Sequence, residues 1–290
     1  MHKSPNNSQI IWRTLLREFD LTRRGVVMGI LNVTPDSFSD GGRFVDTGAA
    51  LAHAESMIAH GAEIIDVGGE STRPGAEPVS EQEELRRVIP IIKALVKRDG
   101  HGERFVVSVD TMKPSVARAA VHAGASIIND VGGFRDAAMI EAAKESGAGV
   151  VIMHMQGEPK TMQDAPSYAD VCVAVREFFC QRVEALVASG VPASSIALDP
   201  GIGFGKTPEH NLALLRRMDE LAFAPHPIAV GVSRKSFIGK VPGISATDDR
   251  MWPTVALTCH AREHGARIFR VHDVKPNVEA LRMTEAILAE

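Results

Sequence analysis

The sequence predicts a single-domain α/β protein with the (β/α)8 fold, the TIM barrel. Eight short apolar runs, rich in β-branched residues, alternate with segments of helical pattern. Most of these runs are continuously apolar rather than alternating, which is typical of parallel strands buried on both faces. No Pro/Ser-rich linker or change of composition divides the 290 residues. A doubly wound open sheet is the alternative arrangement of the same elements.

The predicted strands are the apolar runs themselves. In chain order they are Val26–Val33, Glu63–Val67, Phe105–Val109, Ser126–Asn129, Gly149–Met153, Ser195–Leu198, Pro227–Val232 and Arg267–Val271. Residues 1–25 precede the first strand, and we expect this N-terminal segment to close the bottom of the barrel, with Trp12 covering the core. The barrel itself then comprises residues 26–290.

The predicted helices have recognisable ends. Ser80 and Glu83 have the spacing of a capping box, and Pro114 stands in the first turn of a helix that stops before Gly124. The helices are Thr47–His60, Ser80–Lys97, Pro114–Ala123, Asp136–Ser146, Tyr168–Ser189, Thr207–Leu221, Ala246–His264 and Pro276–Leu288.

Two connections between a strand and the next helix are unusually long. They run over Thr34–Asp46, after the first strand, and Gly68–Val79, after the second. Both carry Gly, Pro, Ser and charged residues, and both belong to the face where a barrel holds its active site. We therefore expect mobile loops that act as lids or binding loops rather than spacers.

Composition argues against several classes of protein. A net charge of −4 gives no reason to expect nucleic acid as a partner. No apolar run approaches the ~20 residues that a membrane span needs, and the polar N-terminus does not resemble a secretion signal. Cys172, Cys180 and Cys259 are odd in number and lack metal-ligand spacing, so we expect reduced thiols. These features favour a cytoplasmic protein.

Polar side chains stand at the carboxyl ends of the predicted strands, where barrel enzymes place their active sites. In chain order they are Asn32, Asp66, Asp110, Asn129, His154, Asp199, Lys235, Arg270, His272 and Asp273. Capping buried strands would need fewer such groups. We therefore expect the set to form one active site.

Part of this set suits a flat heterocycle. Asp110, Asn129 and Asp199 offer acceptors and one amide donor, and a carboxylate can accept two parallel N–H bonds. Met153 would either wall such a ring or fill the core. The set therefore indicates a ring with adjacent N–H donors.

The remainder of the set suits an anion. Lys235, Arg270 and His272 fit phosphate, diphosphate or a developing negative charge. Asn32 offers a neutral oxygen, a plausible ligand for magnesium shared with phosphate oxygens. A zinc site made by His154 and His272 is an alternative, although two histidines alone are weak evidence for metal.

Gly205-Lys206-Thr207 resembles the end of a nucleotide-binding phosphate loop. Pro200 stands where that motif requires glycine, which argues against a nucleotide triphosphatase. The alternating glycines of this segment instead allow the backbone to approach a ligand closely, and Phe204 between them would offer an aromatic face.

Eight segments in register resemble the signature motifs of dihydropteroate synthase, from about Val26 to the C-terminus. They are Gly29–Gly42, Asp66–Gly75, Ser108–Thr111, Ile127–Asp130, Met153–Gly157, Asp199–Lys206, Ser233–Ser236 and Arg270–Val274. The resemblance implies a pterin-binding barrel that condenses 6-hydroxymethyl-7,8-dihydropterin diphosphate with para-aminobenzoate, giving 7,8-dihydropteroate and diphosphate in folate biosynthesis. It also implies a sulfonamide target and a homodimer formed through the last barrel helices.

The resemblance also implies roles for matching positions. The pterin would be held by Asp110, Asn129, Met153, Asp199 and Lys235. The diphosphate would be held by Asn32, Thr72, Arg270 and His272, with Mg²⁺ at Asn32. The aminobenzoate would be held by Phe38, Thr72, Arg73, Pro74, Phe204 and Ser236. The implied catalytic residues are Asp36, Arg73, Lys235, Arg270 and His272.

Two other functions stay open at this point. A corrinoid-linked methyltetrahydrofolate methyltransferase uses a related pterin barrel but does not need the two signature loops that are intact here. A non-catalytic pterin-binding protein would not need the diphosphate-binding residues, which are also present.

Overall fold

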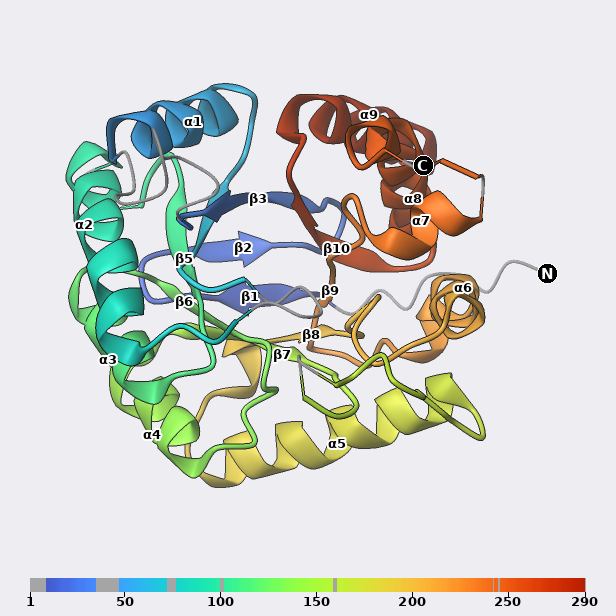
Figure 1. The fold of residues 1–290 in the computed structure, drawn as a ribbon, viewed down its shortest axis with the longest axis horizontal. Coiled ribbons are helices and arrows are strands. Elements are labelled where there is room, and N and C mark those ends of the chain that lie inside the picture. The colour runs from blue at the N-terminus through green and yellow to red at the C-terminus, as the bar shows by residue number, and fades with distance from the viewer. Residues whose placement is uncertain are drawn as a thin grey trace.

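Eight parallel strands close into a barrel, and helices surround it (Figure 1). The computed structural model describes residues 9–34, 47–71, 77–99, 102–158, 161–241, 243–244 and 246–289. The strands follow one another around the barrel in chain order, and β10 closes it against β3. The predicted (β/α)8 architecture is therefore confirmed, and the open-sheet alternative is wrong.

The barrel strands lie close to their predicted positions. They are β3 (Val26–Asn32), β4 (Ile64–Gly68), β5 (Val106–Asp110), β6 (Ile127–Asp130), β7 (Gly149–Met153), β8 (Ile196–Asp199), β9 (Ile228–Val230) and β10 (Ala266–Val271). The largest difference is β9, which is only three residues long. It ends before Gly231, although Val232 beyond it is still buried.

Most predicted helices are present with small shifts at their ends. The helices are α1 (Thr47–Ala59), α2 (Glu81–Asp99), α3 (Pro114–His122), α4 (Ala137–Ser146), α5 (Val171–Ala188), α6 (Pro208–Arg216), α7 (Ser236–Lys240), α8 (Met251–Glu263) and α9 (Val274–Leu288), with short 3₁₀ turns at η1 (Ala193–Ser195), η2 (Met218–Glu220) and η3 (Asp248–Arg250). Among the described helices, none has the length and apolar character that crossing a bilayer requires.

A small N-terminal hairpin covers one end of the barrel. Its strands, β1 (Ile11–Arg13) and β2 (Glu18–Asp20), pair antiparallel and place Trp12 opposite Phe19. Both rings are fully buried, 5.8 Å apart between centroids, and Trp12 Nε1 donates a hydrogen bond to the carbonyl of Ser195 at 3.0 Å. They pack on inward-facing side chains near the amino ends of the strands, such as Met28 and Ile64. The hairpin therefore covers the end of the barrel opposite the active-site face.

Alternation along each strand decides which side chains face the barrel axis. In β4, Ile64 belongs to the inner cluster and Ile65 to the outer layer beneath the helices. Two residues beyond Ile64, Asp66 faces inward again, because side chains of a strand alternate between its two faces. The same count places Asn32, Asp110, Asn129, Asp199 and Arg270 inside the barrel, toward the carboxyl ends of their strands. The alternation of side chains along each strand thus places polar residues from distant segments together inside the barrel.

Candidate active site

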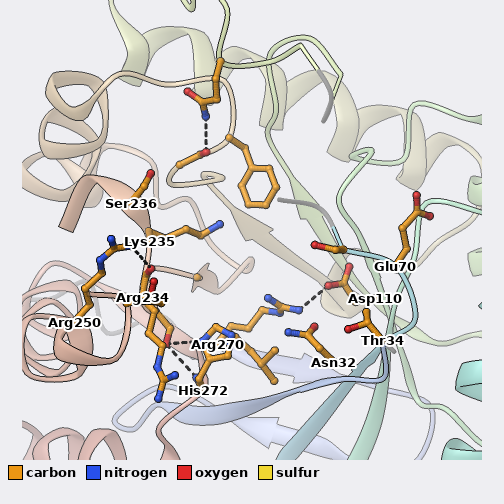
Figure 2. Close-up of a pocket in the computed structure, with 18 of the residues that line it drawn as sticks. Asn32, Thr34, Glu70, Asp110, Arg234, Lys235, Ser236, Arg250, Arg270 and His272 are labelled. Carbon is orange, nitrogen blue, oxygen red and sulfur yellow. Dashed lines mark hydrogen bonds and ion pairs between the residues drawn. The ribbon is translucent and has the colours of Figure 1, made fainter. Parts of the chain in front are cut away.

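A cavity of about 820 Å³ opens at the carboxyl ends of the strands. Among the predicted site residues, its lining includes Asn32, Asp110, Phe204, Lys235, Ser236, Arg270 and His272. Figure 2 shows Asn32, Thr34 and Asp110 on one side of Arg270, with Lys235, Arg234 and Arg250 on the other side. One mouth therefore brings together residues from strands that are far apart in the chain.

Arg270 lies between two carboxylates. Its Nε donates to Asp66 Oδ2 at 2.6 Å, and its Nη2 donates to Asp110 Oδ2 at 2.6 Å. Asp66 is fully buried and also accepts a hydrogen bond from Asn129 Nδ2 at 3.1 Å. Asp66 therefore orients both the guanidinium and the amide, a role that the sequence alone did not assign to it.

Burial and charge perturb the titration of this cluster. Burial raises the pKa of Asp110 to about 7; Arg270 opposes the shift and the carboxylate of Asp66 adds to it. Burial works to lower the pKa of Arg270, but the carboxylates of Asp66 and Asp110 outweigh it and raise the pKa overall. Arg270 is thus a permanent cation, whereas Asp110 exchanges its proton near neutral pH.

Three predicted pterin-binding residues are buried beside the cavity and are not among the residues that line it. Asn129, Met153 and Asp199 are each less than 7% exposed, at 5%, 4% and 6%. Asp199 Oδ1 accepts a hydrogen bond from the Gly201 amide at 2.7 Å, and burial raises the pKa of Asp199. A Cβ on Gly231, which lines the cavity, would lie 3.7 Å from Asp199 Oδ2. The missing side chain at Gly231 therefore gives a ligand access to this carboxylate.

An aromatic ring and a lysine form the opposite wall. The ammonium of Lys235 lies 3.8 Å from the centroid of the Phe204 ring, a cation–π contact. Met153, Met155 and Met162 pack with Phe204 in one apolar cluster. A flat ring bound against this wall would meet polarizable sulfur, an aromatic face and a cation.

The turn that carries Lys235 is held by an ion pair. Arg234 has a φ of +56°, and its Nε and Nη2 contact Asp273 Oδ2 and Oδ1 at 2.9 and 2.6 Å. Its backbone amide donates to Thr254 Oγ1 at 3.1 Å, and its carbonyl accepts from Arg250 Nη1 at 3.2 Å. A bidentate Arg–carboxylate pair fixes geometry as well as charge, so it holds the strained backbone next to Lys235.

The glycine-rich segment after β8 is fitted closely to its neighbours. A Cβ on Gly201, at φ +64°, would lie 1.9 Å from the carbonyl oxygen of His154. A Cβ on Gly205, at φ +59°, would lie 2.4 Å from the carbonyl oxygen of Gln156. Only glycine fits both positions, and the close approach here is to the protein's own backbone.

Lys206 is turned into this segment rather than toward a phosphate. Its ammonium is buried and donates to the carbonyls of Gly201 and Phe204 at 3.0 and 2.9 Å. Its Nζ also lies 3.0 Å from Nδ1 of His154. Burial lowers the pKa of Lys206 to about 7. The geometry thus gives the phosphate-loop interpretation no support.

His154 is likewise engaged inside the barrel mouth. Burial, followed by the charge of Lys206, lowers the pKa of His154 to about 2, so the imidazole is neutral. His272 instead contacts Ser233 Oγ through Nδ1 at 2.9 Å and lines the cavity. Within the described chain, no metal-binding group contains either histidine. The zinc alternative gains no support.

A second ion-pair cluster lies beside the start of the second long loop. Lys113 contacts both Glu70 and Glu84, and Glu70 Oε1 accepts a hydrogen bond from the Val79 amide at 3.3 Å. Glu70 lines the cavity, whereas Glu84 is fully buried in α2. These contacts join the two ends of the loop, and no pattern in the sequence pairs these residues.

Five predicted site residues lie outside the described residues. Asp36 and Phe38 belong to the first long loop, and Thr72, Arg73 and Pro74 belong to the second. Their predicted roles, and the expected mobility of both loops, stay predictions.

Comparison with known proteins agrees with this geometry. The family model described as pterin binding enzyme matches residues 28–272. The dihydropteroate synthase of Escherichia coli K12 is 48% identical over 263 residues, covering 91% of this chain and 92% of that protein.

Solved structures are equally similar. The Yersinia pestis dihydropteroate synthase in complex with a sulfonamide drug has a TM-score of 0.89 and 45% identity, covering 97% of this chain and 100% of that chain. The Xanthomonas albilineans enzyme with 4-aminobenzoic acid has a TM-score of 0.89 and 42% identity, covering 98% of this chain and 100% of that chain.

The barrel, its polar mouth and these matches define a pterin-binding enzyme, and the chain belongs to that family. Within the family it groups with the dihydropteroate synthases, which are transferases of folate biosynthesis. The resemblance and the enzyme class predicted from the sequence motifs are therefore confirmed.

Proposed function

We propose that this chain condenses 6-hydroxymethyl-7,8-dihydropterin diphosphate with para-aminobenzoate, releasing diphosphate. One observation carries the proposal: a single cavity places the Asp110 carboxylate beside the cations Lys235 and Arg270, as a ring with a departing anion requires. Solved dihydropteroate synthases that hold 4-aminobenzoic acid and 7,8-dihydropteroate support the same chemistry.

The pterin ring occupies the buried side of the mouth. Asp110 and Asp199 accept hydrogen bonds from ring N–H groups. The amide nitrogen of Asn129 donates to Asp66, so its amide oxygen can bind a neighbouring edge of the ring. Lys235 donates to a ring acceptor, and Met153 contacts the face of the ring. Burial of these groups makes their hydrogen bonds discriminating, because an unmatched ligand would leave them unpaired.

The diphosphate lies on the cationic side of the mouth. Arg270 and His272 donate to its oxygens, together with Asn32 and, in the second loop, Thr72. The guanidinium of Arg270 suits this role, because it stays charged and has five N–H donors, of which its bonds to Asp66 and Asp110 use two.

A magnesium ion fits at Asn32. A Cβ on Gly68 would lie 3.6 Å from Asn32 Oδ1 and 3.7 Å from Asp110 Oδ2, so both oxygens lie beside the same backbone position. Mg²⁺ prefers such oxygen ligands and commonly joins one or two side chains with substrate phosphates. Asn32 would hold the ion, which would neutralise charge on the diphosphate.

The aminobenzoate lies between the wall of Phe204 and Ser236 and the two long loops. Phe204 and Ser236 line the cavity, and Ser236 begins α7. The loop residues proposed for this subsite are Phe38, Thr72, Arg73 and Pro74. Closure of the loops over bound pterin would exclude water from the reacting atoms.

In the reaction, the bond from the exocyclic methylene carbon to the diphosphate oxygen breaks, and its electrons leave with diphosphate. The aryl amine nitrogen forms the new C–N bond and then loses a proton. Arg270 and His272 stabilise the charge that grows on the leaving group, while Asp110 and Asp199 favour the electron-poor ring. The amine is neutral and needs no strong base, so positioning supplies much of the rest. Lys235 and the loop residues Asp36 and Arg73 complete the catalytic set.

A coupled assay for diphosphate release tests the function. We expect release from the pterin diphosphate that depends on added para-aminobenzoate. A corrinoid-linked methyltransferase would release no diphosphate but would demethylate methyltetrahydrofolate. A non-catalytic binder would bind the pterin in calorimetry and turn nothing over. Either result would overturn the proposal.

The quaternary structure and location are also proposals. We infer a homodimer through α8 and α9, which pack together and expose Trp252, Met283 and Ile287. Light scattering after size-exclusion chromatography measures the mass directly, and a monomer at micromolar concentration would contradict this. All three cysteines are free thiols, the form favoured in the reducing cytoplasm. Cell fractionation tests that location.

A further inference from the structure

A cluster of possible metal ligands lies at the opposite end of the barrel from the active site. His260-Ala261-Arg262-Glu263-His264 spans the last turn of α8 and its C-cap. The chain then enters β10 at Ala266, so the cluster stands at the amino ends of the strands, whereas the cavity lies at their carboxyl ends. His260, Glu263 and His264 each place a potential ligand atom within 4.8 Å of the others. We propose that this cluster binds a divalent transition-metal ion of the zinc class.

Hydrogen bonds prepare both histidines as ligands. His260 Nε2 lies 3.1 Å from the carbonyl oxygen of Leu215 in α6, and His264 Nδ1 lies 2.8 Å from the carbonyl oxygen of His260. A carbonyl only accepts, so these nitrogens carry the protons. The lone pairs are then on Nδ1 of His260 and Nε2 of His264. A metal-binding histidine characteristically donates its other N–H to such a backbone oxygen, which fixes the tautomer and the ring orientation.

The ligand set and its spacing suit zinc. Residues four apart lie on one face of a helix, and the two imidazoles are adjacent, with ring centroids 4.1 Å apart. His-x-x-Glu-His is also the order of ligands and acid in one class of zinc enzymes, although the present site lacks a further protein ligand among the described residues. Zinc ligands lie about 2.0–2.2 Å from the metal, so small side-chain rotations would close the set around an ion.

The surroundings favour a cation and leave it room. Glu263 is exposed, both histidines are partly exposed, and in the described part of the chain Glu263 forms no ion pair. The cluster stands at the C-terminal end of the 13-residue helix α8, where the helix dipole is negative. The nearby cation Arg262 is occupied elsewhere, because its Nε contacts Glu285 Oε1 at 2.8 Å.

Zinc binding to the metal-free full chain tests the proposal. Equilibrium dialysis with Zn²⁺ alone compares the wild type with the double variant Glu263→Gln/His264→Ala. The matched control is His122→Ala, which removes an exposed histidine from the end of α3. Because the active-site cavity could also take up zinc, the number of ions bound per chain is the readout. The double variant alters only exposed or partly exposed side chains, so we expect it to fold. Thermal unfolding without metal checks this.

We expect the wild type and His122→Ala to bind one more Zn²⁺ per chain than the double variant. Zinc should also raise the melting temperature of the first two proteins more than that of the third, because an ion that binds only the folded state stabilises it. Diphosphate release with Mg²⁺ should be equal in all three. Equal zinc stoichiometry in the wild type and the double variant would overturn the proposal.

Discussion

Arg270 Nη2 donates a hydrogen bond to Asp110 Oδ2 at 2.6 Å, so the proposed diphosphate-binding cation contacts the proposed pterin-binding acceptor directly. The two residues lie on β10 and β5, on different sides of the barrel axis. This pair links the two halves of the substrate site: ring and diphosphate bind to partners that already share a hydrogen bond. A pterin diphosphate would therefore rearrange one charge network rather than fill two independent subsites.

Asp110→Asn should weaken pterin diphosphate binding. The amide cannot accept two ring N–H bonds, and one buried donor left unpaired costs about 1–3 kcal/mol, which corresponds to roughly 5- to 150-fold in affinity. Calorimetric titration with the pterin diphosphate measures the effect, with Asp219→Asn at an exposed position as the control. An unchanged dissociation constant would remove Asp110 from the pterin site.

The free energy of unfolding should depend on pH through the titration of Asp110. Burial raises the pKa of Asp110 from 3.8 to about 7, so the folded state binds more protons than the unfolded state between these values. The free energy of unfolding contributed by this group therefore falls as pH rises from about 4 to about 7. Urea unfolding at several pH values should show a steeper fall for the wild type than for Asp110→Asn. Parallel pH profiles would contradict the raised pKa.

Most of the fold was accessible from sequence because the barrel strands are continuous apolar runs. The alternation of side chains then placed Asn32, Asp110 and Asp199 on the inner face without further information. The hairpin at Ile11–Asp20 was missed because its strands are three residues long, too short to show a period. The same applies to α7, which has five residues.

The contacts within the site could not be predicted in this way. Arg270 and Asp66 are 204 residues apart, and whether they touch depends on the stagger of the closed barrel rather than on local pattern. The partners of Lys206 were inaccessible for a related reason: Pro200 already argued against a phosphate loop, but the burial of the lysine against the carbonyl of Gly201 follows only from the fold. Sequence spacing identifies the members of the site, whereas their partners follow only from the fold.

Arg270→Lys should impair both turnover and stability. Lysine keeps the charge but lacks the planar fork that reaches Asp66 and Asp110 together, so at least one buried carboxylate loses its partner. Loss of one partner of a buried ion pair costs about 3–5 kcal/mol, and the retained charge should bring the effect toward the lower end. Chemical denaturation and diphosphate release measure the two effects. The control Arg118→Lys, in an exposed pair with Glu145, should change neither, and equal behaviour of the two variants would contradict this account.

Lys206→Met should disturb the aminobenzoate wall. Methionine fills the space but leaves the carbonyls of Gly201 and Phe204 without their donor, at about 1–3 kcal/mol for each unsatisfied group. We expect the KM for para-aminobenzoate to rise more than the KM for the pterin diphosphate, because Phe204 lines the former subsite. Steady-state kinetics separates the two, and Lys275→Met on the exposed face of α9 is the control. A rise in the pterin KM alone would contradict the prediction.

The same variant tests the protonation of Lys206. Burial lowers its pKa from 10.5 to about 7, so the unfolded state binds more protons between these values. The wild type should therefore gain stability relative to Lys206→Met as pH rises from about 7 to about 10. Denaturant unfolding across this range measures the difference, and a difference that does not vary with pH would show that the lysine stays charged in the fold.

Gly201→Ala should destabilise the protein far more than Gly147→Ala, although both glycines have nearly the same backbone conformation. Their φ angles are +64° and +67°, so alanine meets a similar conformational cost of roughly 1–2 kcal/mol at each. At Gly147 a Cβ would have nothing within 4 Å, whereas at Gly201 it would lie 1.9 Å from the His154 carbonyl oxygen. The excess destabilisation of Gly201→Ala, measured by urea unfolding, therefore reports the fit of the glycine segment against β7. That segment also carries Phe204 and Lys206, so activity should fall with stability at Gly201 and stay unchanged at Gly147. Equal losses at the two positions would show that the segment has room to move away from His154.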